Sequence, residues 1–202
     1  MMSQQLPGDE AAPRPAEIGE HLPGDLAIWI FILAELLVFG VFFAAYGFTR
    51  LNNIELFDTY QRTLDRQAGM VNTLLLITGS FFVARAVAAA RADASRRAAH
   101  WLAWALVAGS GFLAVKLAEY AAKFSAGINL STNTFYMFYI SLTFFHFMHV
   151  ILGMVILFVL MLNARRGRYG PANMNGMESG ASYWHMVDLV WIVLFPLVYL
   201  LR

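Results

Sequence analysis

The stretch Phe135–Leu162, FYMFYISLTFFHFMHVILGMVILFVLML, runs for 28 residues without an Asp, Glu, Lys or Arg. A helix of about 20 apolar residues is enough to cross a hydrocarbon core about 30 Å thick. The stretch is therefore predicted to span a membrane. Its two histidines, His146 and His149, are three residues apart and share one helix face near the middle of the span. Polar groups at that depth are costly and tend to face other helices, partners or cavities.

The composition of the whole chain agrees with a membrane protein. Of its 202 residues 59% are hydrophobic and 13% are charged, which is far from the profile of an average soluble domain. The net charge is only +1, without a long basic run, so no nucleic-acid partner is expected. Because cysteine is absent, disulfides, thiolate metal sites, iron–sulfur clusters and covalently attached haem are excluded.

Five apolar windows follow one another along the chain, at residues 26–48, 70–90, 101–122, 135–162 and 183–201. They predict an all-α polytopic membrane protein, in which residues 25–202 form a bundle of five transmembrane helices. Residues 1–24 contain four prolines and four acidic residues, and we expect them to form a disordered cytoplasmic tail. Pro196 is expected to bend the last turns of the fifth helix.

The charges of the loops predict an N-in, C-out orientation. The side of the amino terminus carries seven arginines, and the opposite side carries five basic residues, so the positive-inside rule favours a cytoplasmic amino terminus. The seven are Arg14, Arg91, Arg96, Arg97, Arg165, Arg166 and Arg168, and the five are Arg50, Arg62, Arg66, Lys123 and Arg202. Four indoles are expected at the cytoplasmic interface, those of Trp29, Trp101, Trp104 and Trp184.

Several titratable residues fall deep within the predicted spans. Counting about 1.5 Å of rise per residue places Glu35 near the middle of the first span, level with His146 of the fourth. The residues expected in the middle and inner leaflet, where they could hydrogen-bond across helices, are Glu35, Arg85, His146, His149, His185 and Asp188. A carboxyl group at that depth should stay neutral unless a cation is close. Glu35 is therefore expected to bond to a neighbouring helix or to lipid, and a proton-handling role is the alternative.

A metal site is the alternative for the histidines. His146 and His149 could share a metal with His185 or Asp188, but metal centres need further ligands and supporting hydrogen bonds that the sequence does not supply. A structural network between helices is the favoured interpretation. No cofactor of the chain's own is expected.

A second polar group, made of Lys116 and Glu119, lies toward the outer end of the third span. The two residues are three apart, so they can pair on one helix and snorkel to the interface. We expect little function there. A different class of hypothesis makes the chain itself a conductor of protons or small solutes, with Glu35 as the titrating group.

Five segments of the chain form a characteristic series: Trp29–Phe39 (WIFILAELLVF), Asn72–Leu76 (NTLLL), Glu119–Tyr120, Phe145–Gly153 (FHFMHVILG), and Glu178 with Tyr183–Trp191 (YWHMVDLVW). In this order they resemble subunit III of the haem-copper oxidases, over nearly all of residues 22–201. The resemblance implies a membrane subunit that is not an enzyme by itself, with haem and metals only in a catalytic partner subunit. It also implies bound phospholipid and a contribution to assembly, stability and proton uptake.

The chain lacks the two leading helices of seven-helix members, which help to build the lipid cleft there. Among the short forms, Tyr183–Leu197 and His21–Asp25 resemble most the NorE-type branch associated with nitric oxide reductase. Subunit III of a quinol or cytochrome c oxidase is the alternative. The resemblance adds Glu178 to the residues expected in a buried network or in contact with lipid or partner, and it implies a bacterial cytoplasmic membrane.

Overall fold

The computed structural model describes residues 24–201, so the tail expected over residues 1–24 lies outside the described residues apart from Gly24. Five long helices make up most of it: α1 (Leu26–Leu51), α3 (Arg66–Arg91), α4 (Ser95–Ser125), α5 (Thr134–Arg165) and α6 (Asn175–Phe195). A short helix, α2 (Ile54–Gln61), follows α1, and a π-helical turn, η1 (Pro196–Leu200), follows α6. Residues 24–201 form no β-strand.

The five long helices are each long and apolar enough to cross a membrane, which confirms the predicted all-α fold of five transmembrane helices. The N-in, C-out orientation stays a prediction. Several helices extend beyond the apolar windows, and the longest extension at one helix end is that of α6, which begins at Asn175 rather than at residue 183. Its first residues, NGMESGAS, are polar or small except for Met177, so a pattern based on apolarity alone misses them.

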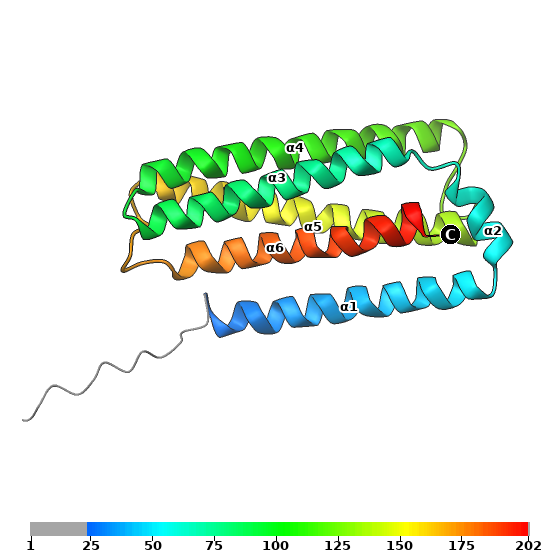
Figure 1. Ribbon diagram of the computed structural model, residues 1–202, viewed down its shortest axis with the longest axis horizontal. Coiled ribbons are helices and arrows are strands. Elements are labelled where there is room, and N and C mark those ends of the chain that lie inside the picture. The colour runs from blue at the N-terminus through cyan, green and yellow to red at the C-terminus, as the bar shows by residue number, and fades with distance from the viewer. Residues whose placement is uncertain (1–23, 202) are drawn as a thin grey trace, which may run out of the picture.

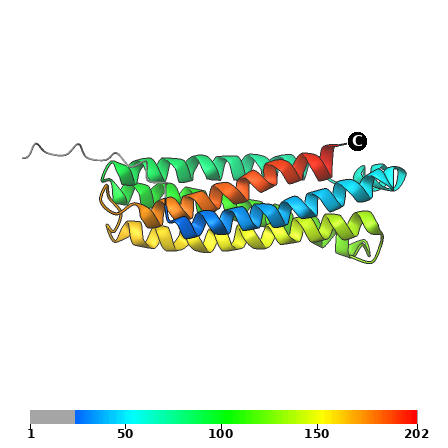
Figure 2. The same cartoon turned by 90° about the horizontal axis from the view of Figure 1, so that it is seen from below.

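The helices α3, α4, α5 and α6 form a four-helix bundle, and α1 lies along its outside (Figure 1). Seen from below, α1 runs beside α5 and α6 (Figure 2). Only Ile32, Phe39 and Tyr46 of α1 are buried. These residues are seven apart, so they form one stripe on one face. The rest of α1 leaves a wide apolar surface uncovered by the described chain.

The centre of the bundle is built around the indole of Trp184, which is 1% exposed. Gly79 of α3, Gly109 of α4 and Gly153 of α5 surround it, and a Cβ added to them would lie 3.3, 3.1 and 3.0 Å from indole carbons. Glycine lets the backbones of three helices approach one large ring. The prediction of Trp184 as an interfacial indole is therefore wrong, because three small residues make room for it in the core.

Pro196 determines the backbone conformation of the residues that follow α6. Proline has no N–H to continue the helical hydrogen bonds, and the five residues from Pro196 adopt the wider π-helical turn. The amide of Leu201 donates to the Pro196 carbonyl at 2.9 Å. The side chain of Gln61 in α2 donates to the Val198 carbonyl at 2.9 Å, which fixes η1. Sequence patterns do not predict α2, because eight half-polar residues give no membrane signal.

Candidate functional site

Glu35 and His149 meet between α1 and α5. The Nε2 atom of His149 lies 3.1 Å from Glu35 Oε2, and Nδ1 lies 2.8 Å from the carbonyl oxygen of Phe145. A carbonyl only accepts, so Nδ1 carries a proton. Nε2 then either accepts from a protonated Glu35 or donates to its carboxylate, and both forms keep the bond. The side chains are 20% and 11% exposed, which places the pair at the edge of the bundle rather than sealed within it.

His146 is fully buried, but it makes no hydrogen bond with any residue in 24–201. Its ring packs among aromatic rings, with centroids 5.2 Å from Trp191, 5.8 Å from Phe112 and 6.4 Å from Phe39. The expectation that both histidines hydrogen-bond across helices is thus met for His149 and wrong for His146. His146 and His149 are three residues apart, so their side chains point about 60° apart around the axis of α5. His149 therefore faces α1 at the edge of the bundle, and His146 faces the bundle interior.

The remaining members of the expected deep group lie apart from Glu35. Arg85 is exposed and stacks over the ring of Trp101 at 5.5 Å. Asp188 is 8% exposed, and its Oδ1 has no hydrogen-bond partner in the described chain. His185 is exposed and lines a hollow of about 300 Å³ between α3 and α6. The residues expected to form a single network therefore lie in separate parts of the structure.

Glu178 joins three elements at one end of the bundle. Its Oε1 accepts from Arg91 Nη2 of α3 at 2.8 Å, and its Oε2 accepts from the Gly24 amide at 3.2 Å. Glu178 itself lies in the first turn of α6. One carboxylate thus ties the start of α1 to α3 and α6.

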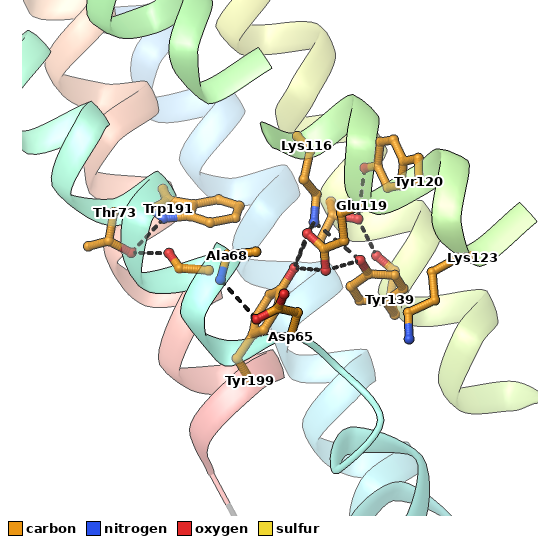
Figure 3. Close-up of polar contacts among 12 residues, drawn as sticks. Asp65, Ala68, Thr73, Lys116, Glu119, Tyr120, Lys123, Tyr139, Trp191 and Tyr199 are labelled. Carbon is orange, nitrogen blue, oxygen red and sulfur yellow. Dashed lines mark hydrogen bonds and ion pairs between the residues drawn. The ribbon is translucent and has the colours of Figure 1, made fainter. Parts of the chain in front are cut away.

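The most completely bonded polar group is centred on Lys116 and Glu119 of α4 (Figure 3). Lys116 Nζ donates to Glu119 Oε2 at 3.0 Å, to Tyr199 OH at 2.7 Å and to Tyr139 OH at 3.3 Å. The two hydroxyls donate in turn to Glu119 Oε1, at 2.6 Å from Tyr139 and 2.9 Å from Tyr199. All three ammonium protons therefore have acceptors, and the opposite charges balance. We call these four residues the lysine cluster.

The ion pair is present as predicted from its spacing, but it does not snorkel. The Lys116 side chain is 0% exposed and that of Glu119 is 4% exposed. Aromatic rings surround the ammonium group, at 4.9 to 5.8 Å from the centroids of Tyr120, Tyr139, Trp191 and Tyr199. Ring faces attract a cation, so they replace part of the water it has lost.

The tyrosines of the lysine cluster are the residues that sequence reasoning missed. Tyr139 lies in α5 and Tyr199 in η1, so the cluster links three elements. Tyrosine is counted among the hydrophobic residues of the composition, which hides its hydroxyl group. The spacing of Tyr139 could have revealed it. Tyr139 lies seven residues before His146, so the two side chains share one face of the helix, which points into the bundle.

Hydrogen bonds next to the cluster extend it across the bundle. Tyr120 donates to Thr143 Oγ1 at 2.9 Å, and Thr143 donates to the Tyr139 carbonyl at 2.6 Å. Trp191 Nε1 donates to Thr73 Oγ1 of α3 at 2.9 Å. Polar side chains therefore connect every helix of the four-helix bundle at this level.

The hydrogen bonds of these polar side chains hold helices together. Within residues 24–201, no three His, Asp or Glu side chains come close enough to hold a metal ion. The Glu35–His149 pair, Glu178 and the lysine cluster each bond to groups of other elements, and the lysine cluster is closed to solvent. That haem and metals belong to a partner subunit stays a prediction.

Comparison with known proteins covers the whole described region. A family model described as cytochrome c oxidase subunit III matches residues 23–202. The chain is 32% identical over 177 residues to cytochrome c oxidase subunit 3 of Thermostichus vulcanus, covering 87% of this chain and 86% of the relative. It is 27% identical over 176 residues to quinol oxidase subunit 3 of Bacillus subtilis, with the same coverage of 87% and 86%. Over 180 residues it is 31% identical to heme-copper oxidase subunit I+III of Aeropyrum pernix, covering 86% of this chain and 22% of that protein.

Proposed function

The chain belongs to the cytochrome c oxidase subunit III family, and from that premise we propose that it is a non-catalytic accessory subunit of a respiratory haem-copper oxidase complex. The observation that carries the proposal is the extent of the match, which covers all five membrane helices. The geometry agrees with this role, because the Glu35–His149 pair and the lysine cluster join helices instead of converging on an open site. The chain would act on assembly and stability of the complex, and the Glu35–His149 pair is the candidate for an influence on proton uptake.

The proposed partner is the catalytic, haem-containing membrane subunit. The Aeropyrum pernix relative carries the name subunit I+III, so a region similar to this chain occurs there in one polypeptide named for both subunits. The wide apolar surface of α1 is available for lipid or for a partner in the membrane. We place the complex in a bacterial cytoplasmic membrane, with phospholipid bound to the chain.

The finer proposal is that the complex is a nitric oxide reductase. It is supported by the resemblance of Tyr183–Leu197 and His21–Asp25 to the NorE-type branch. A second candidate is an oxygen-reducing quinol or cytochrome c oxidase. The names of the relatives favour this second candidate, since those compared above are all oxidase subunits.

Purification from native membranes tests the proposal. The full chain carries an affinity tag, the membranes are solubilised in a mild detergent, and the eluate is analysed by visible spectroscopy and mass spectrometry. We expect a haem-containing membrane subunit to co-elute, together with NO or O2 consumption that identifies the complex. The control is the same purification from membranes that contain the chain without a tag, which should yield no haem subunit. Monodisperse chain that never carries a haem subunit would contradict the proposal.

A further inference from the structure

A hollow of about 250 Å³ opens on the seam between α4 and α5. Its lining consists of Arg96, Ala99 and His100 of α4 and Arg165 of α5. It lies at the end of the bundle that holds the α3–α4 turn and the α5–α6 connection, at the left of Figure 1. Beside it the buried hydroxyl of Ser95 donates to the Ala164 carbonyl at 2.9 Å. The two helices are therefore fixed to each other where the hollow begins.

The basic side chains of this hollow form no ion pairs within residues 24–201. Arg96, His100 and Arg165 are exposed, and none of them forms an ion pair with a carboxylate of residues 24–201. In contrast, Arg50 and Arg91 both do form such pairs. No carboxylate lines the hollow. Two guanidinium groups and an imidazole thus line one hollow, and no carboxylate of residues 24–201 lines it with them.

The neighbouring surface is also positively charged. A larger hollow of about 600 Å³ shares Arg96 and His100, and its lining adds Arg97 together with one acid, Asp93. The two hollows together are lined by three arginines, Arg96, Arg97 and Arg165, and by a single carboxylate, that of Asp93. A ligand that enters from the water phase therefore meets a net positive surface.

Below the cations, toward the middle of the span, the seam is apolar. On α4, Ala103 and Val107 follow His100 at spacings of three and seven, which keeps them on its face, and Val107 is 60% exposed. On α5, Phe158 precedes Arg165 by seven residues and is 49% exposed. Both helices are long and apolar enough to span the membrane. Cations at the helix ends and an uncovered apolar strip below them match a ligand with an anionic head and apolar chains.

We propose that this seam is a binding site for an anionic phospholipid. Arg96, His100 and Arg165 hold the phosphate group, and the acyl chains lie along the strip of Val107 and Phe158. Guanidinium groups suit phosphate because they donate in pairs to its oxygens. Basic pockets between membrane helices are suited to such head groups. The site rests on the chain lying in a membrane, and it does not depend on which oxidase the chain serves.

The test uses the full chain, purified in detergent and delipidated. It is incubated with phosphatidylglycerol, or with phosphatidylcholine of the same acyl chains, at constant salt, and retained lipid is counted by native mass spectrometry. We expect retention of phosphatidylglycerol and weak retention of phosphatidylcholine. Each arginine near a membrane surface contributes enough attraction that Arg96→Gln and Arg165→Gln should each weaken retention about fivefold.

Two controls separate the site from general attraction between opposite charges. Arg166→Gln removes the same charge one residue away from Arg165 and outside both hollows, so it should leave retention nearly unchanged. The double variant Arg62→Gln and Arg66→Gln removes two charges from the opposite end of the bundle, and it should also leave retention of phosphatidylglycerol nearly unchanged. Melting temperatures in detergent confirm that each variant is folded.

Three outcomes would overturn the proposal. The first is equal retention of the two lipids. The second is an equal effect of Arg165→Gln and Arg166→Gln, which would mean unspecific attraction. The third is displacement of phosphatidylglycerol by excess inorganic phosphate, which would indicate a site for a free anion.

Discussion

The hydroxyl of Tyr199 accepts a hydrogen bond from Lys116 Nζ at 2.7 Å and donates one to Glu119 Oε1 at 2.9 Å, although 83 residues separate the tyrosine from the lysine. Through this hydroxyl the π-helical end of the chain is bonded to the middle of the bundle. An ammonium group buried in a membrane helix is tolerable only when its protons have acceptors and its charge has a counter-ion. The lysine cluster supplies both.

Removal of Lys116 alone should be costly. Lys116→Met leaves Glu119 buried without its counter-ion, and breaking one side of a buried ion pair destabilises by about 3–5 kcal/mol. We expect a clear fall in the melting temperature of the detergent-solubilised protein. The double variant Lys116→Met and Glu119→Leu should be more stable than Lys116→Met, because no unpaired charge remains. A double variant with the summed cost of both single changes would contradict this account.

The hydroxyl of Tyr199 should matter more than a comparable hydroxyl elsewhere. Tyr199→Phe removes one acceptor for Lys116 and one donor for Glu119, and hydrogen bonds to charged groups contribute about 1.5–3 kcal/mol. We expect lower thermal stability. Tyr60→Phe is the matched control, since the half-buried Tyr60 hydroxyl has no hydrogen bond to another described side chain. Equal melting temperatures of the two variants would argue against the cluster.

Two glycines in membrane helices should respond in opposite ways to alanine. At Gly153 the added Cβ would lie 3.0 Å from the indole of Trp184, and overpacking a core costs about 1–3 kcal/mol. At Gly40 nothing in the described chain lies within 4 Å of that position, and alanine is the better helix former. Gly153→Ala should therefore lower the melting temperature, and Gly40→Ala should leave it unchanged or raise it. The reverse order would mean that the indole is packed differently.

The two histidines of α5 should differ in complex assembly. His149→Ala removes the bond to Glu35 between α1 and α5, and an unpaired polar group costs about 1–3 kcal/mol. His146→Leu removes no hydrogen bond within residues 24–201 and should change little. We expect His149→Ala to reduce the amount of partner subunit that co-purifies while turnover per haem stays unchanged. Complexes that assemble fully but no longer turn over would show that His149 acts in the reaction instead.

Predictions from the sequence succeeded where one property dominates. Each long apolar window predicts a helix, because a backbone in hydrocarbon must satisfy its own hydrogen bonds. The pairing of Lys116 with Glu119 followed from spacing alone, since residues three apart on a helix are neighbours. The limits of α6 and the existence of α2 could not be predicted in this way, because polar or short helices outside the hydrocarbon leave no apolar pattern.

The sequence by itself determined that this chain is a five-helix membrane protein, and it predicted how deep the acids, bases and histidines lie along each helix. Depth along an axis follows from residue number, but it does not say which way a side chain points around a helix or which helix it meets. Only the tertiary structure decided that Glu35 reaches His149 while His146 lies among rings, and that Lys116 is enclosed by Tyr139 and Tyr199. Those contacts depend on how helices are rotated and packed, and packing at Trp184 is set by small residues from three separate segments.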